Sequence, residues 1–160
     1  MIRDPPVYRA PMGVGRGDDA AAVERALRDG VCGMGGVVDP PPPDLDAALD
    51  GLLDTGRERV AARLYRFAHV EDGAFVWTRS VDGYVLGRLA GPWSYDGSAE
   101  ARALDLVHVR PCHWLPDPTP ESHVPAATLA TFARGGRNFQ RTHDPHVGAR
   151  SRAVWETAGR

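Results

Sequence analysis

The residues of this chain that are best suited to chemistry are aromatic, and they gather in its second half. Three of the four tryptophans lie within about forty residues, and a tyrosine and an aspartate follow the middle one: Trp77, Trp93, Tyr95, Asp96 and Trp114. A base that stacks on an aromatic face gains about 1–3 kcal/mol, and a nearby carboxylate accepts hydrogen bonds from an exocyclic amine. The set therefore predicts a pocket for a flat heterocycle. The alternative is a sheet core, where strand tryptophans commonly lie.

A second candidate is the segment 134–141, which combines arginines, glycines and side-chain amides. Arginine pairs with phosphate oxygens, while Asn and Gln reach base edges. We expect contacts to a nucleic-acid backbone from Arg79 and from this segment, at Arg134, Arg137, Asn138, Gln140 and Arg141. A flexible, solvated terminus is the alternative.

The distribution of charge also indicates that the C-terminal part of the chain would contact a nucleic acid. All 19 basic residues are arginine, which excludes chemistry that needs a lysine amine. The net charge is −2, but residues 1–54 carry ten acidic residues and five arginines, whereas residues 125–160 carry two acidic residues and six arginines. A polyanion would therefore meet the C-terminal third first.

Patterns typical of enzymes and metal sites are missing from the sequence. No serine lies in a Gly-x-Ser-x-Gly motif, and His143 and His146 have no third ligand nearby. Cys32 and Cys112 are expected to be small buried thiols. We therefore expect no catalysis, no cofactor and no metal.

The elements that must position these residues fall into two halves. In the first half, hydrophobic periodicity predicts strands at 7–10 and 31–38 and helices at 19–29, 45–54 and 57–68. In the second half it predicts strands at 74–79, 84–89 and 104–115, a helix near 125–133, and an arginine-rich tail. This order predicts one α+β domain over 1–160, with a curled sheet flanked by helices.

Several of these stretches, in this order, resemble the EVE-like branch of the PUA-like superfamily, which provides reader domains in modification-dependent restriction systems. The clearest stretches are 75–79 and 83–96, followed by 108–114 with its His-x-Arg-x-x-x-Trp pattern. The stretch 26–36 is similar to the family's passage from helix to strand. The resemblance covers about residues 7–115 and leaves 134–160 as a basic C-terminal extension.

The resemblance implies a PUA-like fold, related to YTH and SRA domains, with a curled sheet or partial barrel that holds a flipped or unpaired base. By position, the base pocket would be formed by Met34, Gly35, Gly36, Trp77, Trp93, Tyr95 and Asp96, with Arg110 and Trp114 in support. Relatives that read methylated adenine in RNA often place a tryptophan after the helix, where this chain has Cys32-Gly33-Met34. This departure leaves the preferred base open.

Together these features predict a non-catalytic DNA-binding protein that flips a modified base, with 5-methylcytosine as the first candidate. A reader of modified RNA is one alternative, and a small-molecule or protein-interaction module is another. Any cleavage would need a separate nuclease or effector protein. No apolar run reaches the length that a membrane span needs, and no secretion signal opens the sequence. We expect a cytoplasmic protein, associated with the nucleoid if it binds DNA.

Overall fold

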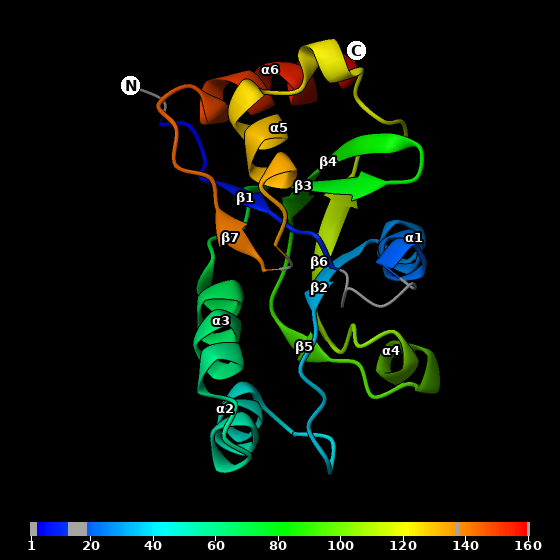
Figure 1. Cartoon of the computed structure of the whole chain (residues 1–160), viewed down its shortest axis with the longest axis vertical. Helices are drawn as coiled ribbons and strands as arrows, with labels where there is room; N and C mark the ends of the chain where they lie inside the picture. Colours follow the sequence, from blue (N-terminus) through cyan, green and yellow to red (C-terminus); the bar gives the residue numbers. More distant parts are fainter. Residues whose placement is uncertain (1–2, 13–18, 137, 160) are drawn as a thin grey trace.

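The computed structural model describes residues 3–12, 19–136 and 138–159, arranged as in Figure 1. Its strands are β1 (Val7–Arg9), β2 (Val31–Met34), β3 (Phe75–Ser80), β4 (Gly83–Leu89), β5 (Ser94–Tyr95), β6 (His108–Trp114) and β7 (Gln140–Arg141). Its α-helices are α1 (Asp19–Asp29), α2 (Leu45–Asp54), α3 (Glu58–His69), α4 (Ala99–Ala103), α5 (Ala126–Ala133) and α6 (Val147–Ala158), with a 3-10 turn at Glu121–His123.

Within the described residues, these strands form one sheet in the order β2-β6-β4-β3-β1-β7, with β5 paired to β6. β1 and β3 are parallel, and the other pairs are antiparallel. On one side β6 pairs with β2, whereas on the other it pairs with β5 near His108 and with β4 near Trp114. The result is a strongly curled, mixed half-barrel flanked by helices, which confirms the predicted α+β class and curled sheet (Figure 1).

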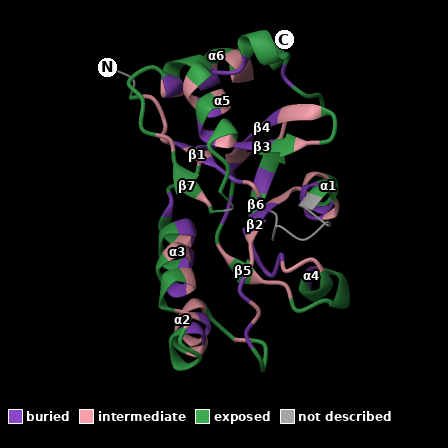
Figure 2. Cartoon of the chain, viewed as in Figure 1, coloured by how far each residue is buried: buried purple, intermediate pink, exposed green. Residues whose placement is uncertain are grey.

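Alternation along the strands sends side chains to two cores on opposite faces of the sheet. Phe75 and Trp77 of β3 are buried on the face covered by α5 and α6. Val76, between them, belongs to the other core, together with residues of α1, α2 and α3. Figure 2 shows the buried residues following the central strands. The inner face, which carries α2 and α3, is the one that positions the candidate site.

The predicted helices agree closely with the observed ones, but two strands are shorter than expected. Asp44 begins α2 by accepting a hydrogen bond from the Ala47 amide at 2.8 Å, as N-cap residues do. The strand predicted at 31–38 ends at Met34, because Gly36 adopts a φ of 121° that breaks the extended chain. The strand predicted at 104–115 begins only at His108, since α4 precedes it and Asp105 has a φ of 48°.

The C-terminal segment folds onto the sheet, which corrects the expectation of an arginine-rich tail. β7 pairs with β1, and α6 covers Trp77. The guanidinium of Arg9, only 5% exposed, donates to the carbonyls of Thr131, Gly135 and Asn138 and to the side chain of Gln140. A buried arginine therefore anchors the loop that contains Gly135.

The described residues contain no helix that is long and apolar enough to cross a membrane, and no cluster of three or more potential metal ligands. Cys32 and Cys112 are free and buried, which confirms the sequence-based prediction. Burial raises the pKa of the Cys32 thiol to about 12.

Replacing Arg9 with methionine should lower the free energy of unfolding by about 2–4 kcal/mol, because the buried Thr131 carbonyl and the part-buried hydrogen bonds to Gly135 and Asn138 lose their donor. The control is Arg79→Met, which removes the same charge from an exposed side chain that lies over the Tyr84 ring. The control should change stability by less than about 1 kcal/mol. Urea unfolding measures both variants, and equal losses would contradict the anchoring role of Arg9.

Candidate functional site

Three side chains lie side by side on the inner face, where β2, β6 and β5 meet. The register pairs Met34 with His108 and His108 with Tyr95, so all three project from the same face of the sheet. Trp93, two residues before Tyr95, stacks against the His108 ring with centroids 6.0 Å apart. Sequence reasoning placed Met34, Trp93 and Tyr95 in one site, and the structure brings them together around His108.

His108 is the centre of this group. Its Nδ1 accepts a hydrogen bond from Trp93 Nε1 at 3.1 Å, so the proton lies on Nε2, which donates to the Gly36 carbonyl at 2.8 Å. Burial lowers the pKa of His108 to about 4, which keeps the ring neutral at neutral pH. The imidazole therefore fixes both the indole of Trp93 and the backbone of Gly36.

Tyr95 is fixed by a different contact. Its hydroxyl accepts from the Val38 amide at 3.1 Å and donates to the Val38 carbonyl at 3.2 Å. The ring meets His108 edge to face and is half-buried. Since the hydroxyl already has two partners, Tyr95 contributes its ring rather than a free polar group.

Gly36 is held from two sides. Its carbonyl accepts from His108, and its amide donates to Asp105 Oδ1 at 2.9 Å. A Cβ on Gly36 would lie 2.9 Å from Val60, and one on Gly35 would lie 2.4 Å from Asp105 Oδ2. Glycine at both positions therefore lets a strip of backbone pass closely between a carboxylate and an imidazole, and Gly36 itself is buried.

A recess of about 30 Å³ lies beside this strip and is lined by Met12, Gly33, Met34, Gly35, Asp105 and Phe139, among others. Ligand pockets in proteins usually measure about 300–1,000 Å³, so the recess admits a small group but not a whole base. Met12 and Asp105 both have a positive φ, at 60° and 48°. Strained non-glycine residues concentrate at functional sites.

The sequence reasoning missed Asp105, His108 and Met12 as members of this site. His108 lies within the His-x-Arg-x-x-x-Trp stretch that carried the resemblance, but nothing near Asp105 in the sequence marks it. The aspartate reaches the site only because the chain reverses after α4.

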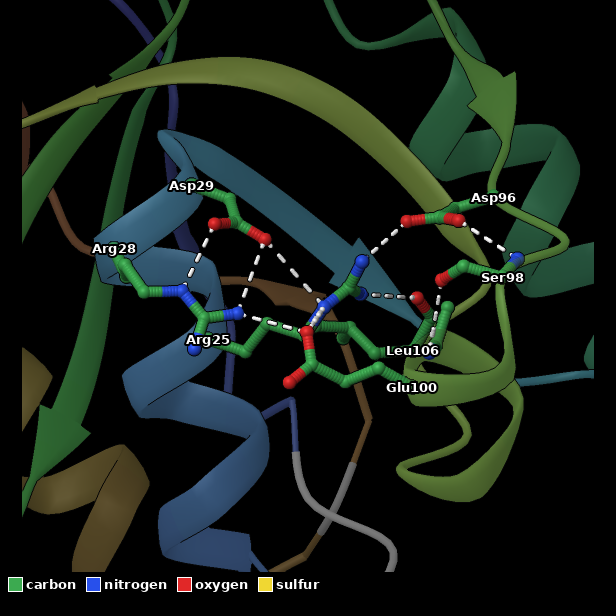
Figure 3. A network of polar contacts seen from close by, with 8 residues as sticks. Arg25, Arg28, Asp29, Asp96, Ser98, Glu100 and Leu106 are labelled. Carbon is green, nitrogen blue, oxygen red and sulfur yellow. Dashed lines mark hydrogen bonds and ion pairs between the residues drawn. The ribbon is translucent and has the colours of Figure 1, made fainter.

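Asp96, which the sequence predicted for the base pocket, is engaged in an ion pair. Figure 3 shows its carboxylate paired with Arg25, whose guanidinium is only 7% exposed and also contacts Glu100 at 2.8 Å. Burial opposes ionisation of Asp96, but hydrogen bonds from Arg25 and Ser98 outweigh it and lower its pKa. Asp96 is therefore an ionised tether between β5 and α1.

Trp77 and Arg110 are also buried structural residues rather than pocket walls. Trp77 has no exposed surface, lies in the core beneath α6, and donates to Ser151 Oγ at 3.0 Å. Because β3 turns it to the opposite face, the prediction that it lines the base pocket is wrong. Arg110 is 2% exposed and donates to three carbonyls, of Phe67, Val70 and Gly91. This placement fits the supporting role expected for it.

Trp114 is half-buried and donates to the Val31 carbonyl at 2.8 Å, so it joins β6 to β2. It lies at the far end of β6 from His108. Trp114 therefore supports the sheet and does not belong to the group that we call the aromatic row, formed by Met34, Trp93, Tyr95 and His108.

The predicted phosphate contacts are dispersed. Arg79 lies exposed on the β3–β4 hairpin, Arg134 is exposed after α5, and Arg141 lies in β7. The side-chain oxygen of Gln140 accepts from Arg9, so a phosphate contact from this residue would use its amide nitrogen. Arg137 lies outside the described residues, and Asn138 has an exposed side chain.

Lowering the pH from 7 to 5 should cost about 2 kcal/mol of stability through His108. The folded pKa of about 4 lies below the ordinary value of 6.5, so the unfolded chain binds the extra proton in this window. The contribution of His108 to the free energy of unfolding is fully present above pH 6.5 and is lost as the pH decreases towards 4. Urea unfolding at several pH values should show this slope in the native chain and lose it in His108→Gln. An unchanged slope in the variant would assign the titration to another group.

Comparisons of this chain with protein-family models, curated proteins and solved structures return no match.

Proposed function

We propose that this protein binds nucleic acid through a flipped or unpaired base, without catalysing a reaction, and prefers DNA that carries a modified base such as 5-methylcytosine. The main supporting observation is the Gly35–Gly36 backbone strip, which Asp105 and His108 hold through hydrogen bonds to Gly36. The half-buried Trp93 ring bonds to the other nitrogen of His108 and is joined to the strip through it. The curled half-barrel flanked by helices supports the PUA-like resemblance, since it is compatible with that fold.

Each part of the site suits one part of the base. The Trp93 indole offers a face for stacking, and its rotation is limited because Nε1 is bonded to His108. Asp105 Oδ2 is an acceptor for an exocyclic amine, while Oδ1 is already used by Gly36. Met12 and Met34 give the recess an apolar wall for a methyl group. An amine beside a methyl group is what 5-methylcytosine presents at one edge.

Binding requires the recess to widen, because about 30 Å³ does not hold a base ring. Methionine side chains adapt readily to a new neighbour, so displacement of Met12 and Met34 is the expected route. Extruding a paired base costs a few kcal/mol, and stacking together with arginine contacts to phosphate offsets this cost. An unpaired base should therefore bind more tightly than the same base in a duplex.

Trp93→Ala should weaken binding to DNA that contains 5-methylcytosine by about tenfold or more, because it removes the stacking face. Trp93→Phe should retain most of the affinity, since it keeps a ring. Leu53→Ala, on the 49%-exposed surface position of α2, is the control. Fluorescence anisotropy with unmodified, 5-methylcytosine and 6-methyladenine DNA, and with the matched RNA, measures the effect. RNA preference would favour the RNA alternative, and no binding at low salt would remove the proposal.

Asp105→Asn should alter which base is preferred without unfolding the site. Asparagine tolerates a positive φ and can keep the acceptor that Gly36 uses, but it replaces the second acceptor with a donor. We expect a lower preference for amine-bearing bases relative to thymine or uracil. Competition between oligonucleotides that differ at one unpaired base measures the ranking. An unchanged ranking would exclude Asp105 from base recognition.

A further inference from the structure

A second, larger cavity lies at the other end of α3 from Gly36. It measures about 420 Å³ and lies among the N-terminal segment, the end of α3 and β7. Arg3, Arg88 and Arg141 line it, together with Tyr8 and His69. This volume falls within the usual range for small-ligand pockets. The aromatic row contributes no residue to its lining, so the cavity is a separate site.

Three carboxylates also line the cavity, but two of them pair with arginines outside the lining. Asp72 accepts from Arg110 at 2.8 Å, and Asp4 lies 3.1 Å from Arg152. Counting these two partners, five guanidinium groups surround three carboxylates. The local field therefore favours an anion although the chain as a whole is slightly acidic.

The end of α3 would ordinarily oppose an anion, because carbonyl groups at a helix C-terminus carry partial negative charge. Here Arg110 donates to the carbonyls of Phe67 at 2.9 Å and Val70 at 2.7 Å. These hydrogen bonds occupy two carbonyls at the helix end and reduce the negative field there, although the same guanidinium also pairs with Asp72. The helix terminus is thus compatible with an anion in the cavity.

Arg88 is already oriented to contact an anion in the cavity. Its guanidinium lies 4.6 Å from the centroid of the Phe75 ring and 5.7 Å from that of Trp155, and Nε donates to the Gly73 carbonyl at 3.0 Å. Stacking on two rings restricts the side chain, so little conformational entropy is lost when it binds. Arg3 and Arg141 are exposed and also line the cavity, so they add two further positive charges to it.

We infer that this cavity binds a phosphate group, with Arg88, Arg141 and Arg3 as its donors. Planar guanidinium groups match phosphate oxygens in pairs, which favours phosphate over a monovalent anion. The phosphate belongs either to a free small molecule or to the end of a nucleic-acid strand. This inference goes beyond the proposed function, because it requires no base and uses none of the residues around Gly36.

Calorimetric titration of the whole chain at low salt, with inorganic phosphate and with a DNA trinucleotide with or without a 5′-phosphate, tests the inference. We expect phosphate-dependent binding that Arg3→Ala/Arg141→Ala weakens by at least about tenfold. The matched control, Arg59→Ala/Arg150→Ala, removes the same charge from exposed positions outside this cavity and should change affinity less than about twofold.

Binding of inorganic phosphate would identify a free anion as sufficient, and binding of the phosphorylated trinucleotide alone would identify a strand end. Either result supports the site if it depends on Arg3 and Arg141. Equal weakening in both double variants, or no binding by the native chain, would overturn it. Trp93→Ala should leave phosphate binding unchanged, so failure of base recognition and failure of this site give different results.

Discussion

The structure depends on a buried arginine at the middle of its most connected strand. Arg110 is 2% exposed, and its donors reach the carbonyls of Phe67, Val70 and Gly91 and the carboxylate of Asp72. A buried charge without such partners costs several kcal/mol, so the end of α3 and the loop before β5 must lie where these acceptors meet the guanidinium. The end of α3 and the loop before β5 are thereby fixed relative to β6.

His108, two residues before Arg110, projects from the same face of the sheet. Its hydrogen-bond partners are positioned by the contacts of Arg110 and by strand pairing. Because Arg110 fixes the loop at Gly91, Trp93 lies where its indole can donate to His108. Because β2 pairs with β6 throughout, the Gly36 carbonyl lies where His108 can donate to it. One strand therefore organises structural support and candidate recognition through alternate residues.

Buried arginines recur as organisers in this lysine-free chain. Arg9 holds the loop after α5, and Arg25 holds β5 and α4 against α1 (Figure 3). A guanidinium has five donors in a fixed plane, so one side chain can join several distant carbonyls, which an ammonium group does less well. Arg9, Arg25 and Arg110 thus stabilise the fold, and the surface charge available to a ligand is smaller than the composition indicates.

The sequence by itself determined the local elements: α1 and α2 follow from apolar periodicity, from Asp44 as an N-cap and from Gly30 as a terminator. It also determined the α+β class and the burial of both thiols, because these depend on patterns within a few residues. Only the tertiary structure decided which polar and aromatic groups remain for a ligand. Asp96 is taken by Arg25, 71 residues away, and Gly36 is joined to His108, 72 residues away. Trp77 and Trp93 look alike in sequence but face different cores. Burial and pairing arise from contacts between distant segments, and no local pattern encodes them.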